Sequence, residues 1–221
     1  MITVNNQIFT DTFTKRGVKV DWDTVWEIVR EIYADKIDRP VYITSSLAYK
    51  SFAGVHSCKS YLNVLYKRVW PRGITQNMLD EAKEKGGWFH NIKMSSTALL
   101  YAVQVESDPI AKARDKDVWD VKSHYTGHAL KNYRIPVYIF HLIAHELQHA
   151  IQTDKVDWKT LKQCRGSFAK SKAYDINHNI NVRQFKDKYY HTPIEADAEA
   201  GAREWGPLMV EMYIEKKMEA K

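Results

Sequence analysis

The chain contains very little cysteine: its 221 residues include only Cys58 and Cys164, which lie far apart in the sequence. They form neither a CxxC pair nor a disulfide framework, so we expect two free thiols in a reducing compartment. No apolar run approaches the roughly 18 residues that a membrane span requires. The first residues do not combine a basic segment with a following apolar one, as a secretory signal would. These absences argue against a disulfide-stapled secreted domain and against membrane contact, and they predict a cytoplasmic protein.

The composition is otherwise that of an ordinary globular protein, with 44% hydrophobic and 27% charged residues. Its 13 tyrosines and 7 tryptophans argue against long disordered stretches. The length suits one good hydrophobic core or at most two small ones. Because no repeat, low-complexity linker or convincing boundary interrupts the chain, we expect a single domain over 1–221, although residues 1–95 match no known pattern.

Positive charge is concentrated in one part of the chain. The net charge is +6, and the segment 155–188 alone holds nine basic and three acidic residues. Such a segment could attract nucleic acid or an acidic protein partner. A solvated basic surface is the more ordinary interpretation, and the sequence favours it.

The most informative stretch is His145-Glu146-Leu147-Gln148-His149, which matches the HExxH pattern within an apolar run from 137 to 151. Histidines at i and i+4 lie on the same face of a helix and can reach one metal ion. Glu146 then lies beside that metal, where it can act as a general base. An amphipathic helix with partly exposed histidines is the alternative, but buried polar groups need partners, and a metal would supply them. His141 lies one turn earlier, and we interpret it as a supporting residue or a groove wall.

A catalytic zinc site usually needs a third protein ligand. The extended pattern with glycine at 152 and histidine at 155 is excluded, because the chain has Gln152 and Lys155 there. A second predicted helix, near the C-terminus, carries three carboxylates among alanines, and alanines allow close helix packing. Acids in a first turn also suit the helix dipole without any metal. The candidates are Glu195, which we favour as the ligand, and Asp197 and Glu199.

The two segments HELQHAIQ and PIEADAEA together resemble the zincins with a glutamate ligand, the gluzincins. They are similar in particular to small bacterial and phage zinc-metallopeptidase-like proteins. The resemblance implies a Zn²⁺ cofactor, the metal ligands His145, His149 and Glu195, and Glu146 as the catalytic base. It also implies an α+β, zincin-like fold, in which a small mixed sheet packs against the HExxH helix and a second ligand-bearing helix. In larger gluzincins an aspartate four residues after the glutamate orients a ligand histidine, and Glu199 occupies that position here.

The function predicted from these residues is hydrolysis of a peptide bond in a protein or peptide substrate. Glu146 takes the proton of the attacking water and returns it to the leaving amine. Tyr190 and His191 precede Glu195 and are candidate catalytic donors to the oxyanion. An alternative is a nucleic-acid- or protein-binding module with a structural or vestigial zinc site, and a non-peptidase hydrolase such as a deformylase is a third.

Local patterns predict the following elements: a helix over 21–32 capped by Asp21 or Asp23, a strand over 41–44, a helix from Thr75 to about 85, a strand over 98–106, a helix with Pro136 in its first turn, and helices over 193–205 and 208–218 separated by a break at Gly206-Pro207. No helix or strand is assigned within 1–18, the stretch 45–72 is ambiguous, and 127–134 is expected to be irregular. The strand over 98–106 is the candidate edge for pairing with a peptide.

Overall fold

The structure of the protein is a computed structural model. It describes residues 1–4, 6–46, 54–60, 74–95, 99, 125–155 and 193–219. Side chains are not described at 7, 8, 45, 46, 54–56, 58–60 and 193–196.

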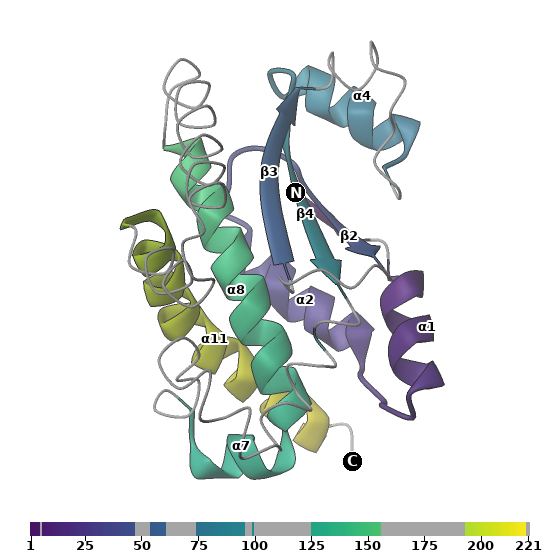
Figure 1. Ribbon diagram of the computed structural model, residues 1–221, viewed down its shortest axis with the longest axis vertical. Coiled ribbons are helices and arrows are strands. Elements are labelled where there is room, and N and C mark those ends of the chain that lie inside the picture. The colour runs from purple at the N-terminus through teal and green to yellow at the C-terminus, as the bar shows by residue number, and fades with distance from the viewer. Residues whose placement is uncertain are drawn as a thin grey trace, which may run out of the picture.

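A four-stranded mixed sheet forms the centre of the described structure (Figure 1). Its strands are β1 (Ile2–Val4), β2 (Val41–Ser46), β3 (Gly54–Ser60) and β4 (Trp88–Ser95), in the order β1-β2-β4-β3. The pairs β1–β2 and β2–β4 are parallel, with Ile2 opposite Val41 and Val41 opposite His90. The pair β3–β4 is antiparallel. The antiparallel strand β3 therefore lies at one end of the strand order.

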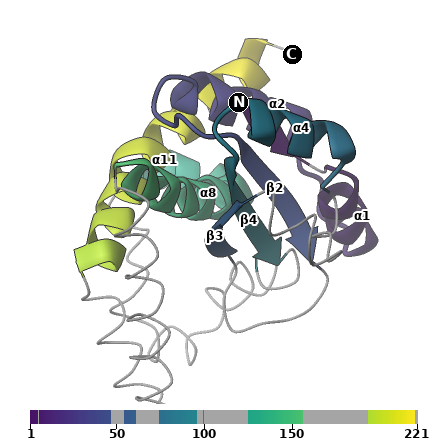
Figure 2. The same ribbon diagram turned by 90° about the horizontal axis from the view of Figure 1, so that it is seen from above.

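Helices pack against the strands β2, β3 and β4. The described helices are α1 (Gln7–Lys15), α2 (Trp22–Tyr33), α4 (Gln76–Glu84), α7 (Gly127–Asn132), α8 (Arg134–Asp154) and α11 (Pro193–Glu219). Helix α8 contacts β3, and α11 contacts both α8 and α2. Seen from above, α8 and α11 lie beside β3, whereas α1 lies on the side of β2 (Figure 2). The long pair α8 and α11 thus flanks the antiparallel edge of the sheet.

The two faces of the sheet belong to different hydrophobic clusters, because successive side chains of a strand point to opposite faces. Val41 and Ile43 of β2 join a large core that also holds side chains of α1, α2, α8 and α11. Tyr42, which lies between them, packs instead with Phe89 of β4 and Leu79 of α4. The N-terminal third of the chain therefore shares the core on which α8 and α11 pack.

Two predicted helices are confirmed together with their N-caps. Asp21 precedes α2 and accepts a hydrogen bond from the backbone N–H of Thr24 at 3.1 Å. Thr75 precedes α4 and accepts one from the backbone N–H of Met78 at 3.4 Å. Gly86 and Gly87 follow α4 with positive φ angles of 90° and 80°, which glycine adopts without strain. The predicted strand at 41–44 is also confirmed, within β2.

Elsewhere the structure adds to the expectations about local structure or differs from them. Residues 7–15 form α1, because Phe9 and Phe13 lie one turn apart and pack on Trp22. The supposedly irregular segment 127–134 contains α7, which Thr126 caps by accepting a hydrogen bond from the backbone N–H of Ala129 at 3.2 Å. Of the predicted strand 98–106 only Leu99 is described, as a buried helical residue, and the rest of that prediction lies outside the described residues.

The predicted break at Gly206-Pro207 is also wrong, since α11 continues through it to Glu219. Proline inside a helix removes one backbone hydrogen bond. Burial of apolar residues on both sides of it offsets that loss: Ala202 before the proline, and Met209 and Val210 after it, are buried in the core. Packing therefore overrides the local helix-breaking signal.

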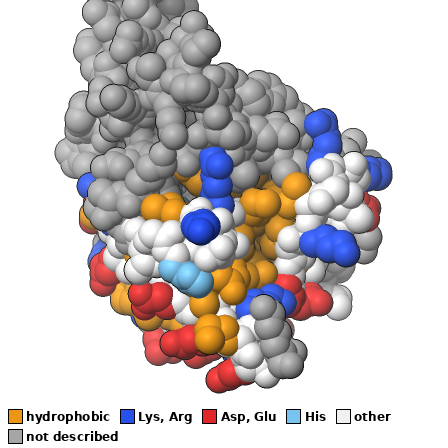
Figure 3. Space-filling model, turned by 90° about the horizontal axis from the view of Figure 1, so that it is seen from below, with side chains coloured by type: hydrophobic (Ala, Val, Ile, Leu, Met, Phe, Trp, Pro, Cys, Tyr) orange, Lys and Arg blue, Asp and Glu red, His pale blue; other side chains and the backbone are white. Residues whose placement is uncertain are grey.

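The described structure is a mixed helix-and-strand fold. None of its described helices is long and apolar enough to cross a membrane. On the face seen from below, hydrophobic side chains lie among acidic and basic ones (Figure 3). Most of the basic segment 155–188 lies outside the described residues.

Candidate metal site

The HExxH residues lie in the second half of α8, a helix of 21 residues. Pro136 is in its first turn, where a missing N–H costs no helix hydrogen bond. The rings of His145 and His149 have centroids 5.0 Å apart and are nearly perpendicular, at 88°. His145 and Glu146 are buried, whereas His149 is half-buried. The motif therefore places two imidazoles together on one helix face.

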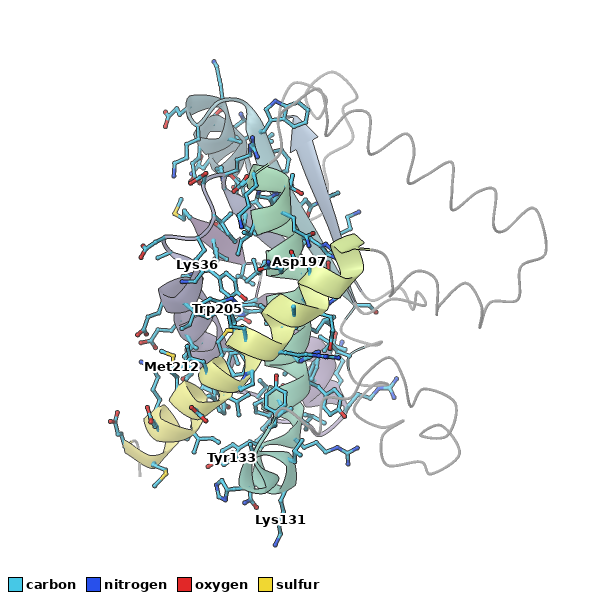
Figure 4. All side chains as sticks on the ribbon, turned by 90° about the vertical axis from the view of Figure 1, so that its left-hand side faces the viewer. Lys36, Lys131, Tyr133, Asp197, Trp205 and Met212 are labelled. Atoms are coloured by element: carbon cyan, nitrogen blue, oxygen red, sulfur yellow. The ribbon has the colours of Figure 1, made fainter. Side chains whose placement is uncertain are left out.

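Helix α11 passes α8 closely because small residues line their interface. Ala198 and Ala202 are completely buried. A Cβ atom on Gly201 would come within 2.8 Å of the side chain of Gln148, and one on Gly206 would meet the Tyr125 hydroxyl. The prediction that small residues would bring two helices together is confirmed (Figure 4).

Glu199 of α11 faces the histidines of α8. Its Oε2 atom lies 3.3 Å from Nε2 of His141 and 3.7 Å from Nδ1 of His145. Its Oε1 accepts a hydrogen bond from Nε of Arg203 at 3.1 Å. Burial opposes ionisation of this carboxyl, but the histidine contacts and Arg203 outweigh it and hold its pKa below the ordinary value. Glu199 is therefore an ionised carboxylate that accepts a hydrogen bond from His141 and lies at ion-pair distance from His145.

His141 is held from both ring nitrogens. Because a carboxylate only accepts hydrogen bonds, Nε2–H of His141 donates to Glu199. The Tyr125 hydroxyl lies 3.4 Å from Nδ1 and donates to it. Burial, with the nearby charge of Glu199, raises the pKa of Tyr125, so the hydroxyl keeps its proton. This buried His141 fits the predicted supporting role.

Asp197 points to a different part of α8, where it contacts two glutamines. Its Oδ2 accepts from Nε2 of Gln148 at 3.1 Å and from Nε2 of Gln152 at 2.7 Å. The Oε1 of Gln152 lies 2.9 Å from Nδ1 of His149. Figure 4 labels Asp197 in the turns of α11 that pass α8. This role of Gln152 was not predicted from the sequence, although a glutamine three residues after a histidine lies within reach of it on a helix.

Three of the predicted site residues cannot be placed by their side chains. Glu195 lies in α11, one turn before Glu199, and its side chain is outside the described atoms. Tyr190 and His191 lie outside the described residues altogether. The described side chains contain no group of three or more His, Cys, Asp or Glu arranged to hold a metal ion.

The histidines that are described fit zinc by their chemistry. Nδ1 of His145 lies 3.7 Å from Oε2 of Glu199, an ion-pair distance, and Nδ1 of His149 lies within hydrogen-bond distance of Oε1 of Gln152, at 2.9 Å. Zinc-binding histidines commonly donate one ring N–H in this way and bind the metal through the other nitrogen. Two imidazoles and one carboxylate form a ligand set that catalytic zinc takes.

A second histidine–carboxylate cluster, which was not predicted from the sequence, lies at the C-terminal end of α8. Asp154 lies 2.9 Å from Nε2 of the buried His90 of β4 and 2.5 Å from the guanidinium of Arg39. It also accepts backbone N–H groups of Asp38 and Arg39. Burial opposes its ionisation, but the His90 and backbone hydrogen bonds prevail and lower the pKa to about 2. This cluster ties the end of α8 to the sheet.

Comparison of the chain with protein-family models, with curated protein sequences and with solved structures found no match.

Proposed function

We propose that this protein is a zinc-dependent metallopeptidase with a zincin-like arrangement of α8 and α11. The observation that carries the proposal is the approach of Glu199, from a distant part of the sequence, to His145 of the HExxH motif. If the histidines of α8 bound no metal, we would not expect a second helix to pack closely on α8 through glycine and alanine and to bring a carboxylate to those histidines. The arrangement supports a site that combines groups from two helices.

The direction of α11 supports Glu195 as the third ligand. Asp197 contacts Gln152, whereas Tyr213 packs on Phe140, so α11 runs antiparallel to α8. Glu195 precedes Glu199 by one helical turn on the same face. Because the helices are antiparallel, the step from Glu199 back to Glu195 on α11 runs in the same direction as the step from His145 to His149 on α8. The backbone of Glu195 thus lies on the side of α11 from which a carboxylate could join both histidines.

In this proposal each residue has a separate task. His145, His149 and Glu195 would hold the zinc ion, which when bound supplies a Lewis acid that lowers the pKa of water towards about 7. Glu146, which follows a ligand and is buried, would accept the proton of the attacking water at its carboxylate. It would then hand that proton to the leaving amine nitrogen. Glu199 would keep His145 oriented, as the residue four positions after the glutamate does in larger gluzincins.

The sheet edge beside α8 suits an extended peptide substrate. Among the described strands, β3 lies at the end of the strand order, and it pairs antiparallel with β4 and contacts α8. A peptide that added to this edge would have its backbone aligned by strand hydrogen bonds next to the HExxH helix. We therefore propose β3 as the substrate-binding edge, in place of the strand expected over 98–106.

The test is to measure zinc content and peptide cleavage in Glu146→Gln. We expect one zinc ion per chain in the wild type and in this variant, and a loss of cleavage on the order of 10²–10⁴-fold. Cleavage is measured by mass spectrometry on a mixed peptide library. The control is Glu211→Gln on the exposed side of α11, which should cleave normally. A wild type that binds no zinc, or an active Glu146→Gln protein, would disprove the proposal.

The ligand set is tested separately by Glu195→Ala. This variant should lose most of its zinc, whereas Glu211→Ala should keep it. Equal zinc content in the two variants would rule out Glu195 as a ligand.

A further inference from the structure

A hydrogen-bonded chain connects Asp197 of α11 with His149 through the side-chain amide of Gln152. The amide Nε2 donates to Asp197 at 2.7 Å, and its Oε1 lies 2.9 Å from Nδ1 of His149. Asp197 is exposed and Gln152 is half-buried. The three groups lie at the end of the α8–α11 interface that is nearer the C-terminus of α8.

Asp197 decides which way the amide of Gln152 points. A carboxylate accepts hydrogen bonds and has none to donate, so the NH₂ group of Gln152 must face it. Asp197 is exposed, and an exposed aspartate is ionised at neutral pH. The amide oxygen is then left facing the imidazole.

The orientation of the amide in turn decides the tautomer of His149. The oxygen Oε1 can only accept, so Nδ1 of His149 must carry the proton that it donates. The lone pair of a neutral imidazole then belongs to Nε2. A metal ion binds the nitrogen that carries the lone pair.

We infer that Gln152 and Asp197 are positioning residues that hold His149 in the Nδ1–H form and so prepare its Nε2 for zinc. This inference rests on the proposed function and adds two residues that do not themselves bind the metal. A carboxylate acting through an amide also polarises the imidazole and makes Nε2 a better donor. The two histidines of the motif thus have different neighbours: Nδ1 of His145 lies 3.7 Å from the carboxylate of Glu199, and Nδ1 of His149 lies 2.9 Å from a neutral amide.

Gln148 provides a matched control on the same helix. It donates to the same oxygen of Asp197 at 3.1 Å, one turn before Gln152. Nδ1 of His149 donates instead to Oε1 of Gln152. Replacing either glutamine by alanine therefore removes one amide and one contact with Asp197, but only the change at 152 removes the acceptor for His149.

The first experiment measures zinc affinity of the full chain by competition with a chromogenic chelator. Gln152→Ala should bind zinc about 10-fold more weakly than the wild type, which is the lower end of the range for a residue that supports a metal ligand. Gln148→Ala should bind zinc as the wild type does. Asp197→Asn, which keeps the shape but no longer fixes the amide, should lose about 3-fold, a smaller part of the same effect.

The second experiment reads the tautomer directly in the metal-free full chain. Nitrogen-15 NMR of the histidine rings, above the usual histidine pKa range, should show His149 protonated at Nδ1 in the wild type and in Gln148→Ala. In Gln152→Ala the ring should shift towards the Nε2–H form. The signals are assigned by their loss in His149→Gln.

The outcomes separate this inference from the proposed function. If the wild type binds zinc and Gln152→Ala matches it in affinity and tautomer, the inference is wrong and the metal site stands. Equal losses in Gln148→Ala and Gln152→Ala would also overturn it, because they would show a general effect of the interface. A wild type without zinc would overturn the proposed function itself.

Discussion

Helix α8 takes part in two histidine–carboxylate clusters that differ in how the carboxylate is surrounded. At its end, Asp154 contacts His90, the Arg39 guanidinium and two backbone N–H groups, which lie on the sheet side of the molecule. In its middle, Glu199 approaches His141 and His145 with one oxygen and an exposed arginine with the other. One carboxylate binds elements of the fold together, and the other faces the HExxH motif.

The difference shows why a buried histidine beside an acid does not by itself indicate a catalytic site. A negative charge at a helix C-terminus is unfavourable because of the helix dipole, so Asp154 depends on its surrounding donors. Its side chain is only 5% exposed, and its partners come from β4 and the loop before β2. Glu199, in contrast, orients groups that could serve an external ligand. The first cluster should matter for stability and the second for metal binding.

Breaking the first cluster should have the largest effect on stability. Asp154→Asn removes the charge that faces buried His90 and Arg39. Because loss of one member of a buried charged pair leaves the other unpaired, we expect the free energy of unfolding to fall by about 3 kcal/mol. Urea denaturation measures this change, and zinc affinity of the folded variant should stay within about twofold of the wild type. A large loss of zinc affinity without loss of stability would reverse the assignment of the two clusters.

Breaking the second cluster should mainly weaken metal binding. Glu199→Gln replaces the carboxylate that faces His145 by a neutral amide. We expect zinc affinity to drop about 10–100-fold, as for other groups that orient a metal ligand. The matched control is Arg203→Ala, which removes the exposed partner of Glu199 and should leave zinc affinity unchanged. Equal zinc binding by Glu199→Gln and the wild type would count against the role of Glu199.

The first cluster should also contribute to the pH dependence of stability. The pKa of Asp154 is about 2 in the folded protein, against an ordinary value of 3.8. Its stabilising effect is therefore present above about pH 4 and is lost as the pH falls towards 2, a change of about 2 kcal/mol. Glu199, whose pKa is also lowered, contributes with the same sign. Thermal unfolding across this range should show a flatter pH dependence for Asp154→Asn, and identical slopes would contradict the account.

The smallest effect is expected at the edge of the second cluster. Tyr125→Phe removes the hydroxyl that lies 3.4 Å from Nδ1 of His141. A long hydrogen bond of this kind should contribute about 0.5–1 kcal/mol to stability, and His141 would keep its contact with Glu199. Chemical denaturation gives the stability change, with Tyr133→Phe as the comparison. Loss of zinc from Tyr125→Phe would mean that His141 is more directly involved in metal binding.

Local signals in the sequence predicted those parts of the fold whose causes are local. Asp21 and Thr75 cap their helices as expected, and Pro136 lies in the first turn of α8. Strand β4 was not predicted, because polar His90 and Asn91 interrupt its pattern and are buried by distant parts of the chain. The continuity of α11 across Pro207 likewise depends on packing with α8 and α2, which no local pattern contains.

The candidate site could be predicted as far as its residues follow one another in a helix. The HExxH pattern predicted that His145 and His149 lie next to each other on one face of a helix, and the alanines of α11 indicated a closely packed second helix. The contacts of Glu199 and Asp197 with α8 depend on the angle and register at which two distant helices meet. The sequence therefore identified Glu195, Asp197 and Glu199 as candidates. Only the packing of the two helices shows which of them contact side chains of α8.

The most direct test of the central claim is diffraction from zinc-soaked crystals of the full chain, recorded on both sides of the zinc absorption edge. The account predicts one anomalous peak between Nε2 of His145 and Nε2 of His149, within about 2 Å of each nitrogen and of a carboxylate oxygen of Glu195. A peak elsewhere, or zinc bound without both histidines, would contradict it.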